Sequence, residues 1–173
     1  MVKTYASDTL LKRPDRALVI HPYAKNLKNP SLKAAQRDLN SCVEEIEGLA
    51  RAIELEVLDS IVIPVSSIQA GAYFGSGQRD NVHDLAHDLA PDIIIVNTAL
   101  SPVQQRNLEK SWDTKVIDRT GLILEIFGAR AQTKEGRLQV ELAALEYQKS
   151  RLVRSWTHLE RQRGGAGFMG GPG

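Results

Sequence analysis

The stretch Asp92-Ile93-Ile94-Ile95-Val96-Asn97 consists of four branched apolar residues between polar ones. It predicts a strand that is covered on both faces, as strands of a parallel sheet are. Three other apolar stretches predict further strands: Ala17–Ile20, which His21, Pro22 and Tyr23 end, then Leu55–Val65 and Lys115–Asp118. Together they suggest a sheet of short, buried strands.

Amphipathic segments lie between the predicted strands. The longest begins at Asn29-Pro30 and carries one apolar stripe along a helix of about six turns, formed by Leu32, Ala35, Leu39, Cys42, Ile46, Leu49 and Ile53. Shorter helices are expected at Val82–Leu89, from the capping box Ser101-Pro102-Val103-Gln104 to Trp112, and at Leu122–Ala131. This alternation predicts an α/β domain at residues 16–132 with a mainly parallel four-stranded sheet flanked by helices, after a flexible N-terminus at residues 1–15.

Residues 133–163 predict a long C-terminal helix of the coiled-coil type, capped by Thr133. Its apolar seam repeats at alternating spacings of four and three and is interrupted only by Lys149: Leu138, Leu142, Leu145, Lys149, Leu152, Trp156 and Leu159. A seam of this kind needs a facing helix, yet the tail at residues 164–173 contains six glycines. We therefore expect the facing helix to be in another chain or beyond Gly173. The unpaired seam is expected to promote self-association; the alternative is that the helix folds back on the α/β domain or frays.

Composition excludes several classes of protein. The 173 residues carry a net charge of +1, 42% are hydrophobic, and the single cysteine, Cys42, cannot form an internal disulfide. The chain contains no apolar run of membrane-spanning length, and its N-terminus lacks the apolar core of a secretory signal. These features predict a cytoplasmic protein with no membrane partner.

Evidence for catalysis in the sequence is weak. The chain contains no P-loop motif, and the GxGxxG pattern at residues 165–170 follows a helix instead of a strand. We interpret His83 and His87 as the hydrated face of a short helix and Cys42 as a small core residue, and expect no metal or cofactor in this chain. A small-molecule enzyme would need the strand-end residues to act together: His21, Ser66, Asn97 and Asp118.

The C-terminal segment is the better candidate for binding. Between residues 149 and 163 its basic residues are Lys149, Arg151, Arg154, Arg161 and Arg163, against the single acid Glu160. A local basic segment of this kind favours nucleic acid, because arginines meet phosphates, glycines permit close backbone approach, and Phe168 can stack on a base. The alternative is a solvated helix face followed by a flexible linker.

Several motifs resemble the HflX family of ribosome-associated GTPases. They follow one another in the family's order: Tyr73-Phe74-Gly75-Ser76-Gly77, Ser101-Pro102-Val103-Gln104-Gln105-Arg106-Asn107-Leu108-Glu109, Asp118-Arg119-Thr120-Gly121-Leu122-Ile123-Leu124-Glu125-Ile126-Phe127, Thr133-Lys134-Glu135-Gly136-Arg137-Leu138-Gln139-Val140-Glu141-Leu142, Trp156-Thr157-His158-Leu159-Glu160-Arg161-Gln162-Arg163-Gly164-Gly165 and Gly170-Gly171-Pro172-Gly173. The resemblance covers nearly the whole chain from about residue 15.

This resemblance implies an N-terminal α/β domain, a two-helix arm with a glycine-rich tip, and a G domain that hydrolyses GTP with Mg²⁺. It also implies binding to the large (50S) ribosomal subunit and, for some members, ribosome splitting under stress. At the arm tip the residues expected to contact rRNA are Arg154, Arg161 and Arg163, through phosphates, and Gly164, Gly165, Gly167, Phe168, Gly170 and Gly171.

Because the sequence ends at Gly173, we expect it to be a piece of a longer protein, without the returning arm helix and the G domain, and inactive as a GTPase alone. In the longer protein, the G domain would be its partner in cis. An alternative hypothesis is that the α/β domain regulates nucleotide hydrolysis by that G domain, with the arm as a hinge.

Overall fold

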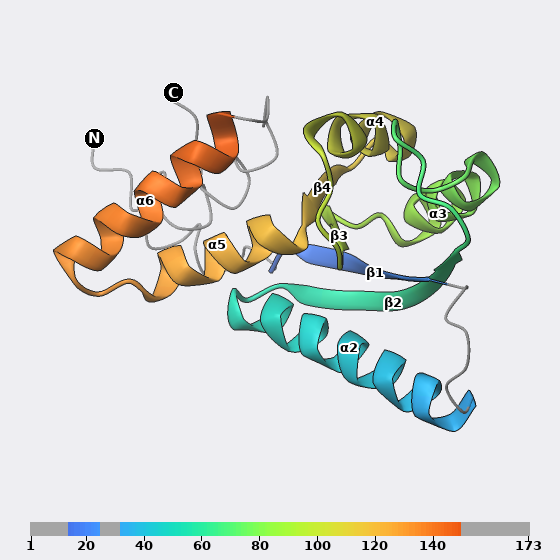
Figure 1. Ribbon diagram of the computed structural model, residues 1–173, viewed down its shortest axis with the longest axis horizontal. Helices are drawn as coiled ribbons and strands as arrows, with labels where there is room; N and C mark the ends of the chain where they lie inside the picture. Colours follow the sequence, from blue (N-terminus) through green and yellow to red (C-terminus); the bar gives the residue numbers. More distant parts are fainter. Residues whose placement is uncertain (1–13, 25–31, 150–173) are drawn as a thin grey trace, which may run out of the picture.

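The computed structural model describes residues 14–24 and 32–149 as a parallel sheet flanked by helices (Figure 1). The strands are β1 (Arg16–Ala24), β2 (Glu56–Val65), β3 (Ile93–Val96) and β4 (Lys115–Asp118). All pairings are parallel and the strand order is β2-β1-β3-β4. The predicted fold class is therefore confirmed.

Strand β1 is longer than predicted, because His21, Pro22 and Tyr23 continue it instead of ending it. The even-numbered residues of β1 direct their backbone N–H and C=O groups toward β3. The carbonyl of Ile20, for example, accepts from the N–H of Asn97. Pro22 would face the same side, but β3 has already ended at Val96. The missing N–H of Pro22 therefore costs no hydrogen bond in the sheet.

Five helices are described: α2 (Leu32–Ala52), α3 (Ser76–Leu89), α4 (Pro102–Trp112), α5 (Arg119–Arg130) and α6 (Lys134–Lys149). Helix α2 covers one face of the sheet, and α3 and α4 cover the other (Figure 1). Helix α6 returns along α5, to which a short turn at residues 131–133 connects it. None of the helices in the described ranges is long and apolar enough to cross a membrane.

Two hydrophobic clusters fill the space on either side of the sheet. Alternate residues of β1 supply them, with Ala17 and Val19 in one cluster and Leu18 and Ile20 in the other. This division follows from the strand period of two residues. Strand β3 is buried along its whole length, as its uninterrupted apolar sequence predicts. Phe74, within the glycine-rich loop before α3, is also fully buried and belongs to the cluster under α3 and α4.

Local capping explains where the helices begin. The predicted capping box of α4 is present: Ser101 Oγ accepts from the Gln104 N–H at 3.1 Å, and Gln104 Oε1 accepts from the Ser101 N–H at 2.9 Å. Thr133 Oγ1 accepts from the Gly136 N–H at 2.9 Å and so caps α6 as predicted. Helix α5 begins at Arg119, three residues earlier than predicted, because Asp118 at the end of β4 is its N-cap.

Candidate functional site

All residues predicted to contact rRNA lie outside the described residues. They are Arg154, Arg161, Arg163, Gly164, Gly165, Gly167, Phe168, Gly170 and Gly171. The predicted long helix is described as α6, from Lys134 to Lys149. Within the described residues, the candidate site is therefore the base of the arm, together with the carboxyl edge of the sheet against which it lies.

Helix α6 is apolar on two opposite sides. Leu138, Leu142 and Leu145 of the predicted seam are 55%, 60% and 59% exposed. Ala144 and Tyr147 face the other way and are 1% and 9% exposed, inside the cluster formed by α2, α5 and the sheet. The seam leucines are thus accessible on α6, while a separate side of the helix attaches it to the domain.

Tyr147 attaches α6 through its hydroxyl as well as its ring. The Tyr147 hydroxyl donates to Asp118 Oδ1 at 2.6 Å, and the same oxygen accepts from the Gly121 N–H at 2.9 Å. Asp118 Oδ2 accepts from the Leu100 N–H at 3.0 Å, and the side chain is completely buried. Both oxygens of the Asp118 carboxylate accept hydrogen bonds from groups of the protein, so the side chain has a structural role. This disfavours Asp118 as a catalytic acid or base.

A polar network joins the carboxyl ends of β1 and β3. His21 Nδ1 and Asn97 Nδ2 are 3.0 Å apart, and Asn97 Oδ1 accepts from Arg119 Nη1 at 3.0 Å. Arg119 Nη2 reaches Glu45 Oε1 on α2 at 2.8 Å. In the sheet order β2-β1-β3-β4, the strand that follows β1 in the chain lies on one side of this pair and the strand that follows β3 lies on the other. The carboxyl ends of β1 and β3 are therefore the position where open α/β sheets place their ligands.

The network favours a neutral imidazole at His21. Burial lowers the pKa of His21, and Arg119 lowers it further, while Asp38 opposes them. The hydrogen bonds also indicate a neutral imidazole. The side-chain oxygen of Asn97 accepts from Arg119, so its NH₂ group is directed at Nδ1 of His21. An unprotonated Nδ1 is needed to accept from that group.

Cys42 lies beside this network and is only partly buried, so the prediction that it is a core residue was wrong. The core side of α2 is formed further along the helix, by Ile46 and Ala50. Burial raises the pKa of the Cys42 thiol, and the negative charges of Asp38 and Glu45 raise it further. A thiol with a raised pKa is a poor nucleophile.

The structure brings together two of the four strand-end residues that an enzyme would need, His21 and Asn97. Ser66 is exposed beyond the end of β2 and has no part in the network, and Asp118 is occupied by the contacts given above. The sequence analysis overlooked Arg119 and Glu45 as members of the network. Their meeting depends on the strand order, which the spacing of residues does not encode.

The histidine pair on α3 is exposed, as interpreted from the sequence. His83 Nδ1 lies 3.0 Å from the carbonyl oxygen of Ser111 near the end of α4, and His87 lies beside Asp88. Within the described ranges, no three His, Cys, Asp or Glu side chains are placed to hold a metal ion. His83 connects the middle of α3 to the end of α4.

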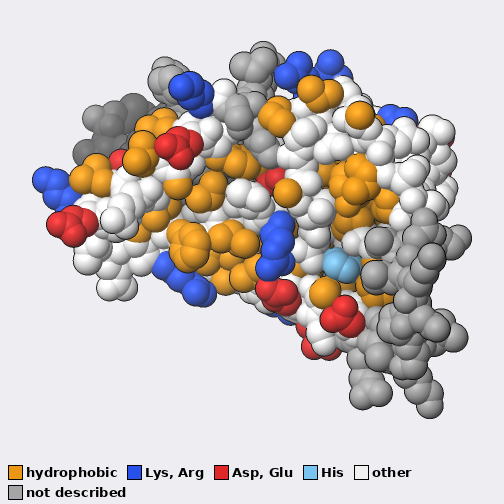
Figure 2. Space-filling model, viewed as in Figure 1, with side chains coloured by type: hydrophobic (Ala, Val, Ile, Leu, Met, Phe, Trp, Pro, Cys, Tyr) orange, Lys and Arg blue, Asp and Glu red, His pale blue; other side chains and the backbone are white. Residues whose placement is uncertain are grey.

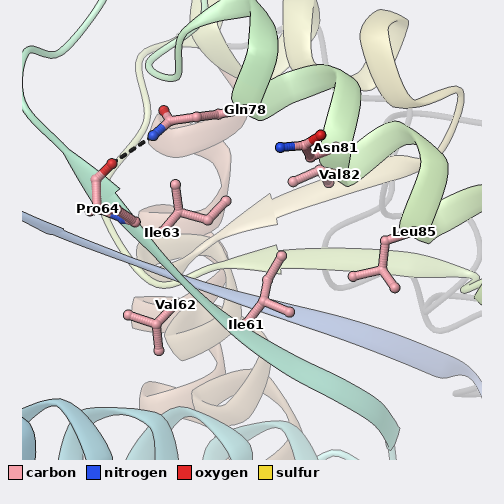
Figure 3. Close-up of a pocket in the computed structure, with 8 residues that line it drawn as sticks. All are labelled: Ile61, Val62, Ile63, Pro64, Gln78, Asn81, Val82 and Leu85. Carbon is pink, nitrogen blue, oxygen red and sulfur yellow. Dashed lines mark hydrogen bonds between the residues drawn. The ribbon is translucent and has the colours of Figure 1, made fainter.

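A mostly apolar groove of about 390 Å³ lies between the edge strand β2 and helix α3 (Figure 3). Its lining residues are Ile61, Val62, Ile63, Pro64, Gln78, Asn81, Val82 and Leu85. Gln78 Nε2 donates to the carbonyl of Pro64 at 2.6 Å across one end of the groove. Pro64 has no N–H to offer, so this end of the edge is poorly suited to pairing with another strand.

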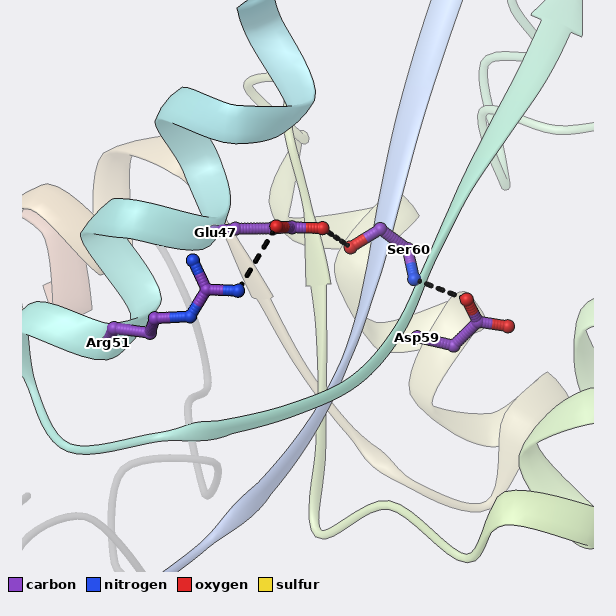
Figure 4. A network of polar contacts seen from close by, with 4 residues as sticks. All are labelled: Glu47, Arg51, Asp59 and Ser60. Atoms are coloured by element: carbon purple, nitrogen blue, oxygen red, sulfur yellow. Dashed lines mark hydrogen bonds and ion pairs between the residues drawn. The ribbon is translucent and has the colours of Figure 1, made fainter. Parts of the chain in front are cut away.

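The middle of β2 is protected in a second way. Asp59 Oδ1 accepts from the Ser60 N–H at 2.8 Å, and Ser60 Oγ donates to Glu47 on α2, which also pairs with Arg51 (Figure 4). The register of β1 against β2 shifts next to this point. Local side-chain bonds and a bulge of this kind protect an edge strand against pairing with other chains.

Two family models match this chain in succession. The first, described as the N-terminal region of a GTP-binding GTPase, matches residues 40–128. The second, described as the middle region of a GTP-binding GTPase, matches residues 130–173. The two matches meet at the end of α5, immediately before the turn that leads into α6.

Curated relatives carry the name GTPase HflX. The protein from Magnetococcus marinus is 49% identical over 160 residues, which is 92% of this chain and 35% of the relative. The protein from Escherichia coli is 40% identical over 156 residues, which is 90% of this chain and 34% of the relative. The chain therefore spans about a third of the length of these relatives.

Solved structures support the fold. A GTP-binding protein from the archaeon Sulfolobus solfataricus, in complex with GDP, superposes with a TM-score of 0.56 at 20% identity, over 90% of this chain and 43% of that one. A G235S variant described as SsGBP gives a TM-score of 0.60 at 22% identity, over 80% of this chain and 40% of the other. From the family models and the curated relatives, we conclude that the chain belongs to the HflX family of GTPases and comprises residues of its N-terminal and middle regions.

Proposed function

We propose that this chain is the ribosome-binding N-terminal region of an HflX-type GTPase. It associates with the large ribosomal subunit in the cytoplasm, contacts rRNA through the arm tip at residues 154–171, and takes part in splitting or rescuing ribosomes under stress. GTP and Mg²⁺ belong to the G domain of the longer protein. The chain itself has no P-loop motif and is expected to have no GTPase activity alone.

The observation that carries this proposal is the division of α6 into a buried and an exposed apolar side. Ala144 and Tyr147 fix the base of the arm, and Leu138, Leu142 and Leu145 remain accessible for a second helix. A two-helix arm of this kind can hold a tip away from the α/β domain. The basic residues Arg154, Arg161 and Arg163 follow along the same predicted helix.

Co-sedimentation with purified large ribosomal subunits tests the proposal. The 173-residue chain is compared at low and moderate salt with a version that ends at Arg163 and with a version whose three arm arginines are replaced by glutamine. We expect binding that falls with salt and weakens in both variants, because phosphate contacts release counterions. Binding that is unchanged in both variants would contradict the assignment of the arm tip.

A second candidate function, regulation of the G domain in cis, is supported by the hydrogen bond between Tyr147 and Asp118. This bond joins the arm to the sheet, so the α/β domain can respond to a movement of the arm. GTP turnover of the longer protein is compared with and without residues 1–132. Equal turnover would exclude regulation and leave ribosome binding as the function of the region.

A further inference from the structure

Asp118 connects three parts of the molecule through one carboxylate. Its donors are the Gly121 N–H in the first turn of α5, the Leu100 N–H in the loop before α4, and the hydroxyl of Tyr147 on α6, at distances of 2.9, 3.0 and 2.6 Å. The Gly121 and Leu100 bonds lie within the α/β domain. The Tyr147 bond reaches the arm.

Tyr147 lies far along α6 from the turn that connects this helix to α5. Helix α6 leaves α5 at the turn over residues 131–133 and runs back beside it (Figure 1). Tyr147 comes roughly 20 Å along the helix from that turn, at a rise of about 1.5 Å per residue. Within the described ranges, Ala144 and Tyr147 are the buried residues of α6. The covalent turn, the apolar packing of these two side chains and the Tyr147–Asp118 hydrogen bond therefore attach the arm to the domain.

Asp118 is also joined to the network at the carboxyl edge. Arg119 follows it directly, and the Arg119 N–H donates to the carbonyl of Thr98 at 3.3 Å. The guanidinium of Arg119 joins Asn97 to Glu45, and Asn97 contacts His21. Arg119 thus connects the first turn of α5 to His21 through Asn97.

We propose that the Tyr147–Asp118 hydrogen bond is a releasable coupling between the arm and the carboxyl edge of the sheet. While the bond is formed, α6 has one direction relative to α2 and the Arg119–Asn97–His21 network is ordered. When α6 is displaced, the Asp118 carboxylate loses its donor from the arm, and the first turn of α5 and the network relax together. This inference goes beyond ribosome binding and does not depend on it.

Paired spin labels on the 173-residue chain measure the first part of the proposal. The labels are attached to cysteines that replace Gly48 on α2 and Glu146 on α6, in a background with Cys42→Ser. Both positions are exposed, and an added Cβ at Gly48 meets nothing within 4 Å. In Tyr147→Phe, which keeps the ring, we expect the displaced population to rise roughly tenfold, as for losing a hydrogen bond to a charged group.

Nuclear magnetic resonance titration of His21 in the same variant measures the second part. Relaxation of Asn97 and Arg119 should move the midpoint of the His21 titration relative to the parent chain. Tyr73→Phe is the matched control, since it removes a tyrosine hydroxyl from the loop before α3, and it should change neither readout. An unchanged distance distribution or an unchanged His21 midpoint in Tyr147→Phe would overturn the coupling, even if the variant were less stable.

Discussion

The two sides of α6 have similar apolar character and opposite surroundings. On the inner side, Ala144 and Tyr147 enter the cluster that α2, α5 and the sheet share. On the outer side, Leu138, Leu142 and Leu145 are more than half exposed. The comparison separates two uses of apolar surface on one helix. The inner side belongs to the fold, and we propose that the outer side receives a further helix.

The largest effect is expected at the inner side. Tyr147→Ala removes a buried ring and a donor to Asp118, so the free energy of unfolding should fall by about 3–5 kcal/mol. Leu142→Ala on the outer side is the matched control and should change it by less than about 0.5 kcal/mol. Urea unfolding followed by circular dichroism measures both. Equal effects would show that the two sides do not differ as described.

A pH-dependent effect is expected at the carboxyl edge, near the inner side of the arm. Burial lowers the pKa of His21 from its usual 6.5, so the unfolded chain takes up a proton at a higher pH than the folded chain does. The stability that the neutral imidazole contributes is therefore present above about pH 6.5 and is lost as the pH falls through the folded-state pKa.

His21→Gln removes this titration and should flatten the corresponding part of the stability profile. The free energy of unfolding, measured between pH 7.5 and 5 (a range chosen to bracket the ordinary His value of about 6.5), tests this expectation. The same replacement at the exposed His87 controls for the loss of an imidazole from the chain. A slope that survives in His21→Gln would mean that other groups produce it.

The smallest effects are expected for glycine-to-alanine replacements, one at the start of the arm and one in a helix of the domain. Gly48→Ala on α2 should raise the free energy of unfolding by about 0.5–1 kcal/mol, because alanine is the better helix former. In Gly136→Ala the added Cβ would lie 2.8 Å from Thr133 Oγ1, the atom that caps α6. Losing the cap lowers the free energy of unfolding by about 1 kcal/mol, which offsets the increase expected from alanine as the better helix former. Thermal unfolding of the two variants distinguishes them, and equal stabilisation would argue against the cap.

Short-range features of the sequence predicted much of the fold. Strand β4 has the predicted bounds, and the capping box at Ser101 and Gln104 forms as expected. These predictions succeed because a short apolar stretch and a capping box are both properties of neighbouring residues. The end of β1 was misjudged at Pro22, since the cost of a proline depends on whether a neighbouring strand continues, and β3 does not.

The candidate site was harder to predict, because it depends on contacts between distant segments. The seam leucines stand out by their spacing, whereas a small Ala144 and an aromatic Tyr147 form no regular stripe on α6. Tyr147 and Asp118 are 29 residues apart, and Arg119 meets Glu45 across 74 residues. Only the strand order and the return of α6 along α5 bring these pairs together.

Sedimentation velocity tests most directly whether the outer side of α6 is a helix-docking surface. The parent chain is compared over a range of concentrations with a variant that carries Leu142→Gln and Leu145→Gln. We predict reversible self-association of the parent through the seam, at least about tenfold weaker in the variant, a change of about 1.4 kcal/mol. The variant should keep the parent's stability to urea. A parent that remains monomeric with a fully helical arm, or a variant that associates equally well, would contradict the assignment of the outer side as a docking surface.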